Sequence, residues 1–386
     1  MTRKTLRNYA ILPVCLIIFF ISSLAGDQGT LAELYRKGKV RLVPELIIDA
    51  KSLPKDVLFV GLTALASDSE GNIYVLDASD SNIKKFDPSG KFVKVIGRKG
   101  QGPGEFNLPY EMAIARDRLL IYDMGNWRLS HLALDGTLIK NVPLSSPNER
   151  PIKIRGFHGG EFVLETEKTY YEVPDKPQDR RIAILDPDLK PKTEIYFGSV
   201  LRNIYLVVPS KSITNVPQPF CADIHWDVSP SGNILVGFSD KYEVSIFSAN
   251  KEELGLIDHA WNPIKVTDED KKKWFDGMGQ VSDKGTKLGA PDFIVKATKF
   301  PRFKPAFDEV FWDPEGNILI HPILKEGQSR YYDAFNPKGK FIARVEFVGS
   351  PPYFYSQQKR VTMGSIWACE TDANGYYRVV KWRLSQ

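Results

Sequence analysis

The chain has 386 residues, of which 42% are hydrophobic, 26% charged and 12% aromatic, and this composition excludes a disordered or fibrous protein. The formal net charge of +5 falls to +2 without residues 1–25, because that segment holds three basic residues and no acidic ones. A nearly neutral protein has no strong attraction to nucleic acid or to an anionic membrane. We therefore predict no nucleic-acid partner.

Residues 1–25 have the pattern of a secretory signal. Three basic residues precede an apolar run at 11–21, and Ser23-Leu24-Ala25 follows as a small-residue cleavage site. The apolar run is shorter than the roughly 20 residues that span a bilayer. We predict cleavage after Ala25 and a periplasmic or extracellular protein, with retention as an N-terminal membrane anchor as the alternative. Residues 26–39 are expected to form a linker or short helix.

Two turn motifs recur along the rest of the chain. Gly-Asn-Ile occurs at 71–73, 232–234 and 316–318, each time before an apolar run. Glycine and asparagine tolerate positive φ, so Gly-Asn between β-rich runs is typical of a hairpin turn. A second motif, Asp/Asn-Pro-x-Gly-Lys-Phe, occurs at 87–92 and 336–341 and suits a type I turn. Together they predict repeating units that are four-stranded antiparallel sheets.

The spacing of the first turn indicates the architecture. With fainter copies included, this turn falls at six positions: Gly71, Arg118, Gly160, Gly232, Gly316 and Gly364. Three of the five spacings match the period of about 40–50 residues that is typical of propeller blades. The two longer spacings predict insertions, namely a loop at 170–180 and an excursion at 259–305 with a helix capped by Thr267.

The two ends of the chain are predicted to close the ring. The last unit offers only three strands, and the N-terminal run 40–48 can supply the fourth, which removes free sheet edges. The sequence therefore predicts an all-β protein, a six-bladed β-propeller of four-stranded blades over residues 40–386. Seven blades are the alternative if an insertion hides a degenerate unit.

Three stretches carry a family resemblance: 71–77 (Gly-Asn-Ile-Tyr-Val-Leu-Asp), 83–87 (Ile-Lys-Lys-Phe-Asp) and 97–106 (Gly-Arg-Lys-Gly-Gln-Gly-Pro-Gly-Glu-Phe). They resemble the NHL-repeat, TolB-like six-bladed propellers that bacteria export, and the third is similar to that family's linker between blades. The resemblance implies a ring with a central channel. Its members range from binding scaffolds to lyases and lactonases, so the resemblance does not fix an activity.

The chain has no compact catalytic or metal motif. It lacks a nucleophile elbow, a P-loop ending and His-Glu-x-x-His, and its five histidines are far apart in sequence. Cys221 and Cys369 lie in non-adjacent repeats and are expected to be free thiols. No cofactor is predicted; zinc held by His225 with other ligands, or calcium held by channel carboxylates, is the alternative.

Candidate binding residues lie at the starts of innermost strands and in the loops beside them. Acidic side chains there would face the channel mouth, and an aromatic next to an arginine is a frequent recognition pair. The predicted site residues are Tyr110, Glu111, Trp127, Arg128, Arg155, Asp223, His225, Asp308 and Glu309.

From these residues we predict an exported, non-catalytic binding scaffold that recognises a small molecule, a glycan or a protein at one face of the ring. Two alternatives are a metal-dependent hydrolase or lyase with its site on the propeller axis, and an accessory subunit of an envelope complex that docks through 259–305.

Overall fold

The computed structural model describes residues 30–173, 175–207, 213–278, 289–349, 359–362, 365–372 and 374–385. The predicted signal at 1–25 lies outside these residues, and the division at residues 25 and 39 remains a prediction. Among the described residues, no helix is long and apolar enough to cross a membrane.

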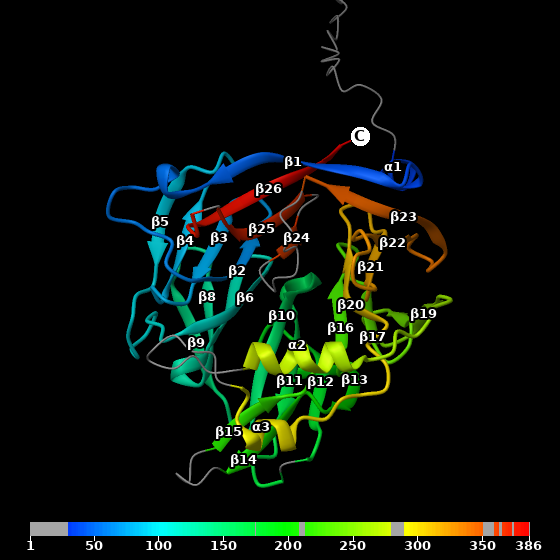
Figure 1. Ribbon diagram of the computed structural model, residues 1–386. Helices are drawn as coiled ribbons and strands as arrows, with labels where there is room; N and C mark the ends of the chain where they lie inside the picture. The colour runs from blue at the N-terminus through cyan, green and yellow to red at the C-terminus, as the bar shows by residue number, and fades with distance from the viewer. Residues whose placement is uncertain are drawn as a thin grey trace, which may run out of the picture.

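Six antiparallel units are arranged as a ring, with one strand of each on the inside (Figure 1). Blade 1 contains β2 (Leu62–Ser67), β3 (Ile73–Asp77), β4 (Asn82–Phe86) and β5 (Phe92–Ile96). Blade 2 contains β6 (Pro109–Ala115), β7 (Arg118–Asp123), β8 (Arg128–Ala133) and β9 (Leu138–Pro143). Blade 3 contains β10 (Glu149–Gly156), β11 (Phe162–Lys168), β12 (Gln178–Leu185) and β13 (Pro191–Val200).

Blade 4 contains β16 (Ile224–Val228), β17 (Ile234–Phe238), β18 (Glu243–Phe247) and β19 (Glu253–Asp258). Blade 5 contains β20 (Phe307–Trp312), β21 (Ile318–Pro322), β22 (Tyr332–Phe335) and β23 (Phe341–Val348). Blade 6 contains β24 (Lys359–Thr362), β25 (Ser365–Thr371), β26 (Tyr377–Ser385) and the N-terminal strand β1 (Lys39–Ile48). In each blade the first strand of this order is innermost.

The ring closes through β1, as predicted. This strand pairs antiparallel with β26 over almost its whole length, with Leu42 opposite Leu384 and Ile48 opposite Val379. Its first three residues also pair parallel with β23 of blade 5, so one strand ties the last two blades together. The outer edge of blade 6 is therefore covered by the start of the chain rather than left open.

The predicted turns explain why the strands reverse where they do. Gly71 and Gly316 have φ of +83° and +84°, which glycine adopts without the strain that a Cβ causes. In these two turns the carboxylates of Asp68 and Asp313 accept hydrogen bonds from the backbone N–H groups that follow. The equivalent position in blade 6, Gly364, lies outside the described residues.

Most of the hydrophobic core lies between neighbouring blades rather than in one centre. One cluster joins Tyr74 and Leu76 of blade 1 to Met112 and Ile121 of blade 2. A strand buried on both faces lacks strict alternation of apolar and polar residues. This explains the continuous apolar run of β3, all five residues of which are buried.

The two long spacings hold insertions and no seventh blade in the part of the chain that the structure describes. The hairpin of β14 (Asn203–Val207) and β15 (Ile213–Pro217) follows blade 3, and α2 (Asp268–Met278) and α3 (Asp292–Ala297) follow blade 4. The Thr267 cap is confirmed, since its Oγ1 accepts from the backbone N–H of Asp270 at 3.1 Å. The hairpin was not predicted.

The loop predicted at 170–180 is shorter than expected. Residues 170–180 do not all form a loop, because β12 begins at Gln178 and includes Arg180. Short helical turns complete the fold: α1 (Leu31–Arg36), η1 (Ala50–Ser52), η2 (Met124–Asn126) and η3 (His158–Gly160). Cys221 and Cys369 are free thiols, as expected.

Two faces of the ring follow from the strand order. We call the face where the innermost strands begin the start face and the opposite one the end face. Connections between blades, loops between second and third strands, β14–β15 and α2–α3 belong to the start face. Helix α1 is fastened to the end face, where Tyr35 donates its hydroxyl to Asp313 at 2.8 Å and the N–H of Leu31 donates to Glu315 at 2.8 Å.

Candidate binding site on the start face

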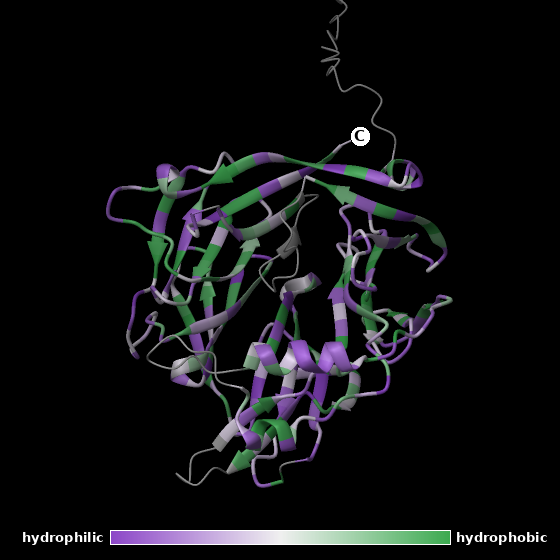
Figure 2. Cartoon of the chain, viewed as in Figure 1, coloured by the Kyte–Doolittle hydropathy of each residue, from purple (hydrophilic) through white to green (hydrophobic). Residues whose placement is uncertain are grey.

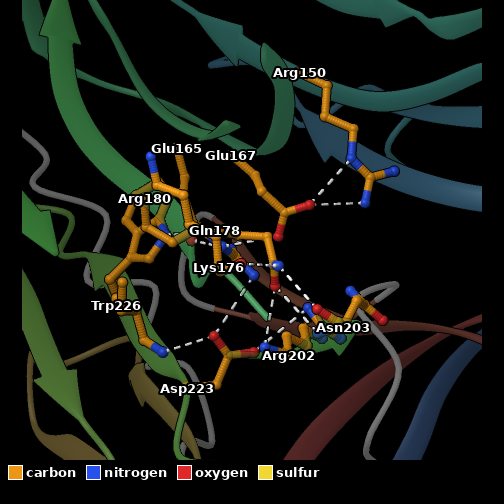
Figure 3. Close-up of polar contacts among 11 residues, drawn as sticks. Arg150, Glu165, Glu167, Lys176, Gln178, Arg180, Arg202, Asn203, Asp223 and Trp226 are labelled. Carbon is orange, nitrogen blue, oxygen red and sulfur yellow. Dashed lines mark hydrogen bonds and ion pairs between the residues drawn. The ribbon is translucent and has the colours of Figure 1, made fainter. Parts of the chain in front are cut away.

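A network of buried charges lies where blade 3 meets the start face (Figure 3). Its centre is Arg180 of β12, whose side chain is 1% exposed. The guanidinium lies 2.6 Å from Glu165 and 3.1 Å from Glu167, both on β11, and 3.6 Å from Asp223. Since side chains two residues apart point to the same face of a strand, Glu165 and Glu167 can both reach one arginine.

Two further arginines neutralise the outer carboxylates of this network. Arg150 lies 3.0 Å from Glu167, and Arg202 lies 3.4 Å from Asp223. With Arg180, Glu165, Glu167 and Asp223, these residues form what we call the blade 3 network. It has three cations and three carboxylates, which is how buried charges are tolerated.

Burial shifts the protonation equilibria inside this network. Burial raises the pKa of Glu165 above its ordinary value, against the opposing effect of Arg180. Burial alone would lower the pKa of Arg180, but Glu165, Asp223 and Glu167 together raise it. The arginine therefore remains charged and holds the three carboxylates together.

Strand β16 connects this network to the axis. The indole N–H of Trp226 donates to Glu165 at 2.7 Å, although the two residues belong to different blades. On the axial side, Lys153 of β10 donates to the carbonyl oxygen of Trp226 and its Nζ lies 4.5 Å from the centre of the indole ring. Arg155 pairs with Asp227 at 3.1 Å, so blades 3 and 4 are joined by charged contacts.

Blade 5 adds carboxylates nearer the start face, at the beginning of β20. Asp308 contacts Nδ1 of His321 at 2.7 Å, and Glu309 accepts from the Tyr332 hydroxyl at 2.7 Å. The field of Asp308 and Glu309 reaches His225 of blade 4. We call Lys153, Arg155, His225, Asp227, Asp308 and Glu309 the axial cluster.

Two bases in the axial cluster have lowered pKa values. Burial, followed by the positive charge of Arg155, lowers the pKa of Lys153 to about 7. Burial also lowers the pKa of His225, while Asp223 and Asp308 act in the opposite direction. At neutral pH the cluster therefore contains a neutral imidazole and a lysine near its titration midpoint.

The structure brings most of the predicted site residues together. Arg155, His225, Asp308 and Glu309 are in the axial cluster, and Asp223 links it to the blade 3 network. Glu111 is buried on β6 and its charge acts on Lys153. Tyr110 lies next to it and is 38% exposed.

Trp127 and Arg128 lie elsewhere and make structural contacts. The Trp127 indole donates to the carbonyl of Ser146 at 3.3 Å and packs edge-on against Tyr122. Arg128 pairs with Asp123 at 2.9 Å and donates to three carbonyls of the glycine-rich linker at 97–106. In the described part of the chain no contact joins this pair to the axial cluster.

Sequence reasoning missed the residues at the centre of the site. The signal for Lys153, Glu165, Glu167 and Arg180 was a charge inside a run that is otherwise typical of a strand. That pattern is also typical of a strand with one solvated face, so only the register of β11 against β12 distinguishes the two cases.

The described residues contain no group of three or more His, Cys, Asp or Glu side chains arranged to hold a metal ion. The carboxylates of the site contact arginines, a histidine or a tyrosine instead. This geometry supports recognition through charges and hydrogen bonds.

The α2–α3 insertion lies on the start face, in front of blades 3 and 4 (Figure 1). Lys273 of α2 binds Glu326 of blade 5 at 2.8 Å, and Lys299 after α3 binds Asp175 of blade 3 at 2.8 Å. Figure 2 shows α2 as mostly hydrophilic, and none of its residues is buried. The insertion is thus fastened by ion pairs to blades 3 and 5, on either side of blade 4.

A hollow lies on the end face, between blades 1 and 2. It has a volume of about 640 Å³ and mixes carboxylates with cations, among them Asp135 and Lys94. Lys94 donates to the backbone carbonyl of Asp135 at 2.7 Å. This groove is open and its charges belong to surface turns.

Comparisons with known proteins agree with the ring. Residues 54–225 match the model of a family, DUF5128, that is described as a 6-bladed beta-propeller. No curated protein is similar enough in sequence to count as a match.

Solved structures extend this similarity over most of the chain. A member of the DUF4221 family from Bacteroides vulgatus has a TM-score of 0.51 at 13% identity, covering 90% of this chain and 99% of that one. Virginiamycin B lyase from Staphylococcus aureus has a TM-score of 0.42 at 10% identity, covering 88% of this chain and 99% of that one. Regucalcin, a calcium-binding protein from Agrobacterium tumefaciens, has a TM-score of 0.38 at 12% identity, covering 89% of this chain and 96% of that one. At such identities the likeness concerns the fold, which does not determine function.

Proposed function

We propose that this protein is a binding scaffold that holds a polar ligand at the axial cluster inside the ring of its propeller. The observation that carries the proposal is the convergence of charged side chains from blades 3, 4 and 5 along the axis, from Asp308 near the start face to Arg155 and Asp227 near the end face. A stable monomer has no need for so many desolvated charges, because apolar residues of similar volume would stabilise the interface between blades at least as well.

The arrangement supports binding more than catalysis. Lys153 and His225 are bases, but in the described part of the chain no serine or threonine hydroxyl forms a hydrogen bond with either one. The rival hydrolase or lyase lacks a specific observation in its favour among the described residues. Small molecules and glycans fit a site made of separate polar groups on rigid strands.

We also propose a narrower propeller family for this protein and a location outside the cytoplasm. The Gly-Asn-Ile-Tyr-Val-Leu-Asp stretch at 71–77 and the linker at 97–106 support an NHL-type, TolB-like propeller. The basic, apolar and small-residue pattern of residues 1–25 supports export to the periplasm or the exterior.

Saturation-transfer NMR with a panel of neutral and acidic sugars tests the binding proposal. Sugars that bind should lose affinity by at least tenfold when His225→Asn, Asp308→Asn and Glu309→Gln are combined. The matched control combines Lys94→Gln and Asp135→Asn in the end-face groove and should leave binding unchanged. Equal binding by the axial variant and the wild type would contradict the proposal.

A further inference from the structure

Lys153 differs from the other cations of the site in its partners. Five arginines of this region each lie within 4 Å of a carboxylate: Arg150, Arg155, Arg180, Arg202 and Arg330. No carboxylate of the described residues is that close to the Lys153 ammonium. Its neighbours are the carbonyl oxygen and the ring face of Trp226.

These contacts leave the ammonium incompletely satisfied. A lysine ammonium has three donors, and Lys153 uses one of them on the Trp226 carbonyl. The indole face attracts the positive charge but accepts no full hydrogen bond. Lys153 is half-buried, and a cation with donors to spare at such a position is one that an anion can complete.

The charged groups around Lys153 permit an anion to approach. Asp227 is neutralised by Arg155, and Glu165 by Arg180, so neither presents a free negative charge. His225 is neutral because burial lowers its pKa. Glu111 of β6 is the remaining carboxylate whose field acts on Lys153, and one carboxylate repels a dianion more strongly than a monoanion.

Building on the proposed function, we propose that Lys153 is the counter-ion for the carboxylate of an acidic small molecule or acidic sugar. Binding places a carboxylate oxygen against the ammonium, and above the midpoint of the free lysine it draws one proton from solvent. Trp226 holds the lysine in place and does not transfer that proton. The site then selects acids over the corresponding neutral compounds.

Acylation of the wild-type protein tests this with acetate as the probe and acetamide as its neutral counterpart. N-acetoxysuccinimide, an uncharged reagent, is applied in trace amounts, and the rate at each lysine is measured by peptide mass spectrometry. Without a probe, Lys153 should react at pH 7 roughly tenfold or more faster than the exposed Lys192, since an amine reacts in its neutral form.

Acetate should then slow the labelling of Lys153 and acetamide should not. A nearby anion raises an amine's pKa by about one unit or more, which lowers the neutral fraction at pH 7 roughly fivefold. Sodium chloride keeps the ionic strength equal, and Lys192 should be unaffected. Equal rates with acetate and acetamide would overturn the inference, as would slow labelling of Lys153 without a probe.

The acylation experiment and the sugar-binding experiment can fail independently of each other. If sugars bind and the axial variant loses them while acetate leaves Lys153 unchanged, only the assignment of a carboxylate fails. Lys153→Met supplies the assay's blank, and the conclusion does not depend on that variant because the decisive rates come from the unmodified sequence.

Discussion

Removing the central arginine of the blade 3 network should destabilise the protein far more than removing its neighbour on the same strand. Arg180 contacts Glu165 and Glu167, which are almost fully buried, and Arg180→Met leaves Glu165 with only the Trp226 indole as a donor. Breaking a buried ion pair from one side costs about 3–5 kcal/mol, because the remaining charge stays desolvated. We expect a loss of that size in the free energy of unfolding at pH 7.

Arg181→Met is the matched control. Arg181 is the next residue of β12, and its ion pair with Glu194 at 3.0 Å is about half exposed on both sides. Pairs of this kind contribute about 0–1 kcal/mol. Urea denaturation of both variants and of the wild type, followed by tryptophan fluorescence, measures the difference directly.

The loss from Arg180→Met should also depend on pH, with a defined sign. Burial already raises the pKa of Glu165, and without the arginine this folded-state pKa rises further above its unfolded value. A carboxyl with a raised folded pKa destabilises the fold as pH increases, so the deficit should shrink between pH 7 and pH 5. Equal losses for Arg180→Met and Arg181→Met, or a deficit that grows on acidification, would refute the reasoning.

Three further predictions concern other parts of the ring. His131 is fully buried, and burial lowers its pKa to about 4. The free energy of unfolding of the wild type should therefore fall by up to about 3 kcal/mol between pH 6.5 and pH 4. Acid titrations of stability should show that His131→Phe lacks this part of the loss. Arg128→Ala should lower the free energy of unfolding by about 1–3 kcal/mol and speed amide exchange in the 97–106 linker. Arg98→Ala should do neither, because the Arg98 side chain is 82% exposed. Unchanged linker exchange in Arg128→Ala would contradict this prediction. Tyr35→Phe should lower the free energy of unfolding by about 1–2 kcal/mol, because Asp313 loses a buried donor. Tyr376→Phe serves as the control, since Tyr376 is 67% exposed. Equal unfolding midpoints for the two variants would contradict the role of α1.

The fold could be predicted from the sequence because its determinants are local. A glycine with positive φ after an aspartate specifies a turn wherever it occurs, and Gly71 and Gly316 do so in the same way in blades 1 and 5. Closure through β1 followed from counting strands, since the last unit lacked one. The hairpin β14–β15 was missed because its residues carry no copy of the repeated turns.

The site could be predicted only in part because it depends on contacts between blades. Asp223 and His225 were found because they begin an innermost strand, and strand order places them near the axis. Glu165 and Arg180 lie 15 residues apart on adjacent strands, and their pairing depends on the register of β11 with β12. Trp127 next to Arg128 has the composition of a recognition pair, yet the Arg128 donors are used within blade 2 and its linker. Composition does not show whether a side chain is already satisfied.

The most direct test of the convergence of blades on the axis is the titration of His225, followed by NMR of its ring proton. The pKa of His225 should lie below 6.5 in the wild type, fall further in Asp308→Asn, and rise in Lys153→Met, because a carboxylate of blade 5 raises it and a cation of blade 3 lowers it. Asp175→Asn, in the blade 3 loop that binds Lys299, should leave the titration unchanged. If His225 titrates at an ordinary value and is insensitive to both Asp308 and Lys153, the side chains do not meet and the proposed site does not exist.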